Sequence, residues 1–303
     1  MCYNRCMHPV SPQRIAVVDP WVNLHLPHHA ELIRVSPEYQ AIARQFGRLD
    51  EMQRGYSVEE MIAEMDRAGV EKAVLTTYGA DFPEYPTVRQ PTAEEVMEIA
   101  SQHPQRFIAA AGFNSVRALR NPRGIMDAVR RLEDWAKHGR LRVLKVVPFT
   151  TQIPYNDKLL YPLYAKCVEL NIVVTINVGV AGPLYGSIAC QDPRYLEEVC
   201  LDFPGLKIVA AHMGHPWETL LIRLMEKFPN LYLMTSAYSP KHIAPEVIQY
   251  MNTRGSHKVM FSADWPLAGF DRFIEQALAL PFRSEDIRRR YLRDNALAVF
   301  DWR

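Results

Sequence analysis

The sequence has little net charge and no long apolar segment. Its 35 Lys and Arg balance 34 Asp and Glu to a formal charge of +1, which gives no electrostatic reason to bind nucleic acid or an anionic membrane. No apolar run approaches the roughly 20 residues that cross a bilayer, and residues 1–8 contain no apolar signal core. We therefore expect a cytoplasmic protein with no nucleic-acid or membrane partner.

Cysteine is also scarce, with five residues that follow no regular spacing. Two fall in an N-terminal arm, residues 1–14, and three in or near expected helices: Cys2, Cys6, Cys167, Cys190 and Cys200. An odd number of scattered cysteines is typical of reduced thiols in a cytoplasm and argues against a disulfide framework.

No linker, composition shift or low-complexity segment divides the chain. At 303 residues and 48% hydrophobic content it is long enough for two domains, but an α/β barrel also uses this many residues as one domain. We expect a single domain over residues 15–303, preceded by the arm.

Short apolar runs alternate along the chain with amphipathic segments. Two capping boxes, Ser57-Val-Glu-Glu60 and Thr92-Ala-Glu-Glu95, predict where helices begin. The predicted strands are residues 15–18, 72–77, 107–111, 143–147, 172–177, 208–211, 231–235 and 258–261. The predicted helices include residues 57–69, 125–138, 159–170, 195–203, 273–280 and 284–300. Between the first strand and the first helix, residues 24–56 are predicted as a long polar and aromatic connection.

Strands that alternate with helices imply right-handed crossovers and a parallel sheet. Eight such units in about 250 residues match a single (β/α)8 TIM barrel of the α/β class, with the last helices closing the chain. An open doubly wound sheet also alternates, but the lack of a glycine-rich first turn favours the barrel.

A parallel barrel lines its active-site mouth with residues from the carboxyl ends of its strands. These ends carry Trp21, Asn23, Tyr78, Asn114, Lys145, Asn177, His212, Ser236 and Asp264. Lys145 lies between Leu144 and Val146 in an apolar strand, so its amine must reach either the pocket or an edge. Asp264 follows an apolar strand, where an unpaired carboxylate would be costly to bury. It therefore serves the chemistry or caps the helix that follows.

Five segments of the second half resemble, in their order and spacing, the amidohydrolase-related family. They are residues 157–164, 203–214, 228–236, 261–266 and 295–300. This family is the branch of the amidohydrolase superfamily that contains aminocarboxymuconate-semialdehyde decarboxylase, resorcylate-type decarboxylases and several hydrolases. The resemblance covers nearly the whole chain and implies an enzyme of the hydrolase or carbon–carbon lyase type.

Members of this family usually bind one divalent metal, often zinc. Its ligands are a His-x-His after strand one, a histidine after strand five and an aspartate after strand eight, with the strand-six histidine close by. This sequence has Trp21 and Asn23 at the first two positions and Asn177 at the third, so only His212 and Asp264 match. Neutral amides are weak ligands for a transition metal, and an indole fills the volume that a ligand and water need. We therefore expect no metal at the usual site and no cofactor.

The resemblance then implies a metal-independent reaction of a small cyclic or aromatic carboxylated compound. The reaction is either decarboxylation or hydrolysis of a lactone, a C–C bond or a C–N bond. Asp264 is assigned as general base, and His212 as the group that orients the substrate or donates a proton. The residues assigned to substrate binding are Asn23, Trp21, Asn177, Lys145, Tyr78 and Ser236. Among these, Lys145 and the asparagines would hold the anionic end of the substrate.

Several alternatives stay open. The aromatic residues near the mouth either form stacking walls for a flat molecule or pack the loops: Trp21, Tyr78, Tyr185 and Trp265. We expect His215 to pack a loop, and we do not expect the histidines of the first connection, His25, His28 and His29, to replace the missing ligands. Two alternatives to a metal-independent enzyme remain. The barrel could be a catalytically inactive binding or assembly subunit, or a conventional zinc-dependent decarboxylase with non-standard ligands. Relatives often form dimers, so the resemblance also allows a homodimer.

Overall fold

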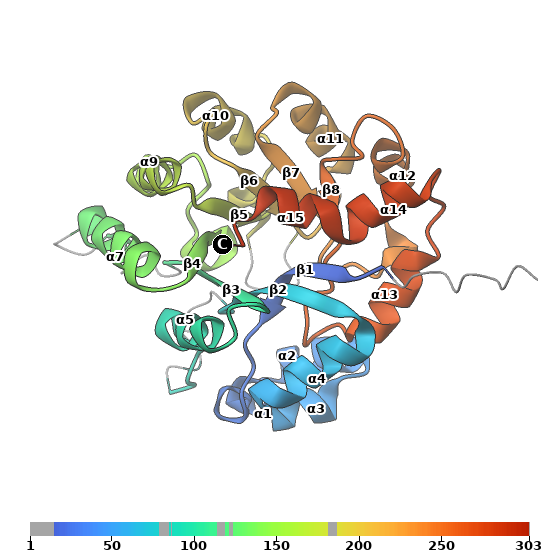
Figure 1. Cartoon of the computed structure of the whole chain (residues 1–303). Helices are drawn as coiled ribbons and strands as arrows, with labels where there is room; N and C mark the ends of the chain where they lie inside the picture. The colour runs from blue at the N-terminus through green and yellow to red at the C-terminus, as the bar shows by residue number, and fades with distance from the viewer. Residues whose placement is uncertain are drawn as a thin grey trace, which may run out of the picture.

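The computed structural model describes residues 15–78, 85, 87–113, 119–120, 124–180 and 187–302. At its centre, eight parallel strands follow one another in chain order. They are β1 (Val17–Asn23), β2 (Val70–Thr76), β3 (Phe107–Ala111), β4 (Leu141–Val146), β5 (Val173–Asn177), β6 (Ile208–Ala211), β7 (Leu231–Met234) and β8 (Val259–Met260). A bridge between Val22 and Trp265, with a 2.8 Å hydrogen bond from Asn23 N to Trp265 O, joins the end of the sheet to its beginning. The predicted TIM barrel is therefore confirmed (Figure 1).

Helices surround the strands on the outside of the barrel (Figure 1). They are α4 (Val58–Ala68), α5 (Ala93–Gln102), α7 (Gly124–His138), α9 (Tyr161–Leu170), α10 (Tyr195–Asp202), α11 (Glu218–Lys227), α12 (Pro245–Met251) and α13 (Phe270–Leu278). Both predicted capping boxes form: Ser57 Oγ accepts from Glu60 N at 3.2 Å, and Thr92 Oγ1 accepts from Glu95 N at 3.1 Å. Within the described residues, every helix is too short or too polar to span a bilayer.

The connection after β1 is not the long loop that the sequence predicted. It contains three helices, α1 (Glu31–Val35), α2 (Pro37–Phe46) and α3 (Leu49–Arg54). The Ser36 hydroxyl caps α2, which begins with Pro37 and ends at Gly47 with a left-handed φ of 70°. Buried residues from all three helices pack together and against the loop after β8: Ile33, Ala43, Met52 and Leu267. A short helix, α8 (Pro148–Thr151), was also missed after β4.

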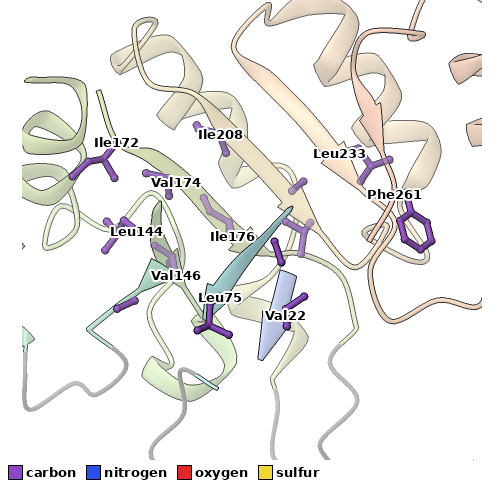
Figure 2. Close-up of a cluster of buried hydrophobic side chains, with 14 of the residues drawn as sticks. Val22, Leu75, Leu144, Val146, Ile172, Val174, Ile176, Ile208, Leu233 and Phe261 are labelled. Carbon is purple, nitrogen blue, oxygen red and sulfur yellow. The ribbon is translucent and has the colours of Figure 1, made fainter. Parts of the chain in front are cut away.

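Alternate strand residues face opposite sides of the barrel wall, as the period of two requires. The outward set packs between strands and helices, including Val22, Leu75, Leu144, Val146, Val174, Ile176, Ile208 and Leu233 (Figure 2). The inward set fills the barrel with apolar side chains: Val18, Val74, Ile108, Val143, Val173, Val209, Met234 and Met260. Lys145 has the inward parity of Val143, so its side chain lies inside the barrel.

The C-terminal segment closes the amino end of the barrel. Helix α14 (Glu285–Arg289) continues through a π-helical turn (Arg290–Asp294) into α15 (Asn295–Val299), which lies across the strands in Figure 1. Val299 and Phe300 pack against the inward apolar cluster. The Asn295 amide donates to Ser256 O at 2.9 Å and to Val259 O at 2.7 Å, where β8 begins. The open end of the barrel is therefore the carboxyl end of the strands.

Candidate functional site

The carboxyl ends of six strands bring the predicted site residues together. They are Trp21 and Asn23 from β1, Tyr78 after β2, Lys145 from β4, Asn177 from β5, His212 after β6 and Asp264 after β8. Ser236, which follows β7, is fully buried beside them. Of the other residues expected here, Asn114 and Tyr185 lie outside the described residues.

Asp264 is held by an amide. The Asn23 side-chain nitrogen donates to Asp264 Oδ1 at 2.7 Å and to Trp265 O at 3.0 Å, so both of its hydrogens are used. Asp264 is 9% exposed and adopts a left-handed backbone, φ 70°, that non-glycine residues rarely take. Such strain persists where the surrounding structure fixes it, and it concentrates at functional sites.

Lys145 lies inside the barrel without a carboxylate partner among the described residues. Its Nζ donates to Thr77 O at 2.7 Å and lies 3.9 Å from the centroid of the Trp21 ring. Only 2% of the residue is exposed. Burial lowers the pKa of Lys145 to about 7, although the negative charge of Asp264 opposes this shift. A large fraction of the amine is therefore neutral near physiological pH.

His212 packs edge-on against Trp21, with ring centroids 4.9 Å apart. Ser236 Oγ accepts from His212 N at 3.1 Å and lies 2.9 Å from His212 Nδ1. This geometry fits the neutral tautomer that carries its ring proton on Nε2, because the hydroxyl hydrogen can then be donated to Nδ1. Burial and the Lys145 charge lower the pKa of His212 against the opposing effect of Asp264, so the imidazole is neutral. His212 and Met213 are both left-handed, with φ of 62° and 59°.

Tyr78 belongs to a hydrogen-bonded chain that the sequence did not reveal. Its hydroxyl bonds His25 Nδ1, and His25 Nε2 lies 2.6 Å from Met52 O, which fixes the ring as a donor at Nε2. Burial lowers the pKa of His25 to about 4. Burial and the Asp264 charge raise the pKa of Tyr78 well above its usual value, so the phenol stays protonated. His25 lies in an irregular segment past the end of β1, as expected, but it is buried there, and its ring bonds Met52 O of α3.

Two buried polar atoms near the strand ends have no hydrogen-bond partner among the described residues. They are Asn177 Oδ1 and Thr77 Oγ1. A buried polar group without a partner costs about 1–3 kcal/mol. Asn177 Oδ1, on the inward-facing side of β5, is therefore an acceptor that a donor group of a ligand would satisfy, and substrate binding by Asn177 stays a prediction.

Asp19 belongs to the candidate site, although the sequence did not reveal this. Its buried carboxylate accepts from Trp21 N at 3.0 Å, from Ser262 Oγ at 2.6 Å and from Ala263 N at 2.9 Å. Burial raises the pKa of Asp19 to about 7 despite these hydrogen bonds, with a further contribution from Asp264. Asp19 thus ties β1 to the turn that carries Asp264, and it positions that turn.

Trp265 does not form a wall of the pocket. Its ring is stacked on Phe270 with a centroid distance of 5.9 Å, and its Nε1 donates to Glu64 at 2.9 Å. It therefore belongs to the packing between strands and outer helices. His215 lies on the surface, where Nδ1 is 2.7 Å from Glu218 Oε1 and 54% of the side chain is exposed.

The histidines of the first connection do not join His212 and Asp264. His28 Nε2 and His29 Nε2 lie 3.2 Å and 3.4 Å from the two carboxylate oxygens of Glu95, at the start of α5. His28, His29 and Glu95 could together hold a metal ion, because one ligand atom of each lies within 4.8 Å of the others. Among the described residues, no other group of three His, Cys, Asp or Glu side chains is this close.

The barrel residues do not fit the divalent metal that the resemblance implies. Trp21 and Asn23 occupy the two positions of β1 at which the family has histidines. The Lys145 amine lies against the Trp21 indole, and the Asn23 amide nitrogen faces Asp264. A nitrogen that donates hydrogens to a carboxylate has no electron pair to give a metal. One imidazole, one carboxylate and one amide oxygen remain, fewer and weaker donors than zinc requires. No catalytic step is therefore derived through a metal.

The barrel resembles several solved structures over its whole length. An uncharacterised TIM-barrel protein from Bordetella bronchiseptica has a TM-score of 0.75 and 23% identity, covering 94% of this chain and 98% of that chain. A 5-carboxyvanillate decarboxylase from Novosphingobium aromaticivorans, solved with manganese and 4-hydroxy-3-methoxy-5-nitrobenzoic acid, has a TM-score of 0.69 and 15% identity, with 95% and 96% coverage. A 2,6-dihydroxybenzoate decarboxylase from Rhizobium has a TM-score of 0.66 and 15% identity, with 94% and 98% coverage. These likenesses show a shared fold.

A sequence search of curated proteins found no match to this chain. The model of the amidohydrolase family, in contrast, matches residues 23–302. This match begins at Asn23, the last residue of β1, and includes the carboxyl ends of all the later strands. The chain therefore belongs to the amidohydrolase family and is an enzyme of the hydrolase or lyase type.

Proposed function

We propose that this enzyme decarboxylates a small, flat carboxylated compound without a metal, with Asp264 as general base. The observation that carries the proposal is the hydrogen bond from the Asn23 amide to Asp264 Oδ1 at 2.7 Å. It puts a neutral donor at the position where the family usually has a metal ligand. A positioned acid or base of this kind contributes about 10²–10⁴ to a rate.

The remaining residues have complementary roles in this proposal. His212 is neutral and carries a proton that it can give to a developing carbanion. Asn177 contacts the polar end of the substrate together with Lys145: its side-chain nitrogen donates to the carboxylate, and its Oδ1, buried without a described partner, can accept from a hydroxyl. Ser236 holds the His212 ring, and Trp21 provides an aromatic face. The Tyr78 hydroxyl donates its hydrogen to His25 Nδ1, so its oxygen can accept a hydrogen bond from the substrate.

Decarboxylation is favoured over other reactions of the family because two of the similar folds are decarboxylases of aromatic acids. Hydrolysis of a lactone is the second candidate. Its support is that the described hydrogen bond to the Asp264 side chain reaches Oδ1, which leaves Oδ2 able to take a proton from water. Asp264 takes a proton from water in the hydrolysis, and in the decarboxylation it takes one from a hydroxyl or amine that is activated before carbon dioxide leaves.

An inactive barrel need not retain these features. His212 and Asp264 both keep a strained left-handed backbone, and Lys145 keeps an amine inside an apolar barrel. Each costs stability, on the order of 1–3 kcal/mol for a strained backbone. A subunit that only binds or assembles gains nothing from them.

The test is turnover of a panel of aromatic acids, cyclic 3-oxo acids and lactones by the wild-type chain and by Asp264→Asn. We expect the variant to lose at least about a hundredfold in kcat/KM. The matched control is Asp271→Asn on α13, which removes an exposed carboxylate that pairs only with Arg67 among the described residues. Equal turnover by wild type and Asp264→Asn would remove Asp264 as the base.

A further inference from the structure

The chain has two buried lysines whose surroundings differ. The Lys258 amine donates to three carbonyl oxygens, those of Phe228 at 3.2 Å, Pro229 at 2.5 Å and Leu231 at 3.1 Å. These three acceptors match the three hydrogens of an ammonium. Lys258 is therefore held as a structural cation at the amino end of β8.

Lys145 has one carbonyl acceptor, Thr77 O, and the face of the Trp21 ring. No carboxylate of the described residues lies within ion-pairing distance of its nitrogen. The ring face favours a cation on this nitrogen, but one carbonyl leaves two hydrogens of an ammonium without an oxygen acceptor among the described residues. A neutral amine needs fewer acceptors, because it donates one hydrogen to Thr77 O and keeps an electron pair. The lowered pKa of about 7 agrees with this geometry. Amines desolvated in this way are the ones that act as nucleophiles toward carbonyl groups.

We propose that Lys145 forms a Schiff base with the ketone of a small 3-oxo carboxylate, and that this iminium accepts the electron pair released by decarboxylation. This Schiff base rests on the proposed function, decarboxylation, and narrows its substrates to small 3-oxo carboxylates. It gives Lys145 a covalent role in place of a point charge. Asn177 and His212 then remain to contact the carboxylate.

The reaction balances without an oxidant or a metal. The Lys145 nitrogen bonds the ketone carbon, and the carbonyl oxygen leaves as water to give the iminium. The bond between the carboxylate and the adjacent carbon then breaks, carbon dioxide leaves, and the electron pair moves to the iminium nitrogen as an enamine forms. The enamine carbon takes a proton, water adds to the iminium, and the ketone product departs from the free amine. The net reaction consumes one proton and releases one carbon dioxide.

The neighbouring groups suit these steps. Loss of water from the first adduct needs a hydrogen-bond donor to the departing oxygen, and we assign that role to the ring N–H of His212, since the Tyr78 hydrogen is held by His25 Nδ1. Asp264, whose charge acts on Lys145 beyond ion-pairing distance, accepts through a bridging water the proton that the attacking nitrogen loses. The Trp21 ring face, 3.9 Å from Nζ, stabilises the cationic iminium that forms on the same nitrogen.

The test begins with the wild-type chain, so it does not depend on a variant that folds. The chain is treated with acetylacetone, a 1,3-diketone that converts a neutral lysine amine into a stable enaminone, and labelled lysines are mapped by mass spectrometry. At neutral pH we expect Lys145 to label on the order of a hundredfold faster than exposed lysines, whose amines are almost fully protonated. Lys258 is the internal control: burial lowers its pKa as well, to about 8, but three carbonyls hold its hydrogens, so we expect it to label far more slowly than Lys145.

A second arm uses acetoacetate with sodium borohydride, which reduces a Schiff base to a permanent adduct. We expect one adduct, on Lys145, and its loss in Lys145→Arg and Lys145→Met. Adducts spread over exposed lysines, or present on Lys258 and absent from Lys145, would overturn the proposal. Turnover that depends on Asp264 while Lys145 stays unlabelled would leave the proposed function standing and remove the Schiff base. Adducts on Lys145 with turnover that ignores Asp264 would support the Schiff base and remove the proposed function.

Discussion

The Asn23 side-chain nitrogen donates to Asp264 Oδ1 at 2.7 Å, across 241 residues of sequence. This contact joins the end of β1 to the turn after β8, where the barrel closes. It also decides what the carboxylate can do. An Asp264 held by an amide remains a base toward a substrate or water, whereas one bound to a metal would be a ligand.

Asn23→Asp places a second carboxylate against the first. Two carboxylates at hydrogen-bond distance cannot both ionise readily, so the pair takes up a proton at a higher pH than a single carboxylate does. We expect the acidic limb of the pH–rate profile to move to higher pH, with activity near neutrality reduced about tenfold or more. The measurement is kcat/KM against pH with a chelator present, so that no metal binds the new pair. Asn23→Ser is the neutral control, and a matching shift in that variant would refute the explanation.

Asp19 supports the site through stability. Asp19→Ala leaves Trp21 N and Ala263 N without their buried acceptor, which costs about 1–3 kcal/mol for each group. We expect the free energy of unfolding to fall by about 3 kcal/mol in urea titrations at constant pH. Ser262→Ala removes one partner of the same carboxylate and should cost only about 1 kcal/mol. Equal losses in the two variants would show that Asp19 does not tie the two strands together.

Much of this arrangement could be predicted from sequence. The apolar runs of β2 to β8 and the two capping boxes were sufficient to predict the barrel, because local pattern determines strands and helices. The strand ends identified His212 and Asp264 for the same reason. The contact between Lys145 and Trp21 could not be predicted, because it depends on how far a flexible side chain reaches across the barrel. Asp19 was overlooked because its three partners lie on β1 and on the distant turn after β8, and nothing local marks it.

The burial of His25 in the first connection could not be predicted from sequence, and it makes the free energy of unfolding depend on pH. His25 is buried between Tyr78 and Met52, and its pKa is lowered to about 4 from the 6.5 of an unfolded chain. Between these pH values the unfolded state binds more protons, so stability rises with pH and is lost as pH falls from 6.5 toward 4. Asp19 contributes the opposite slope, because its folded pKa is raised to about 7.

The measurement is therefore a difference between wild type and His25→Gln. We expect the wild type to lose up to about 3 kcal/mol more than the variant over this acid window, in urea titrations at several pH values. His215→Gln is the control, because that side chain is exposed. Parallel pH dependence in wild type and His25→Gln would contradict the assignment of His25 as a buried neutral ring.

The metal content of the purified chain tests the central claim most directly. The measurement is made on Glu95→Gln, because His28, His29 and Glu95 form a separate group that could hold a divalent ion. After exposure to zinc and manganese and removal of the free ions, we predict less than about 0.1 equivalent of either metal, since the barrel lacks the donors that a structural or catalytic site needs. About one equivalent, lost when Asp264→Asn is added, would contradict the account.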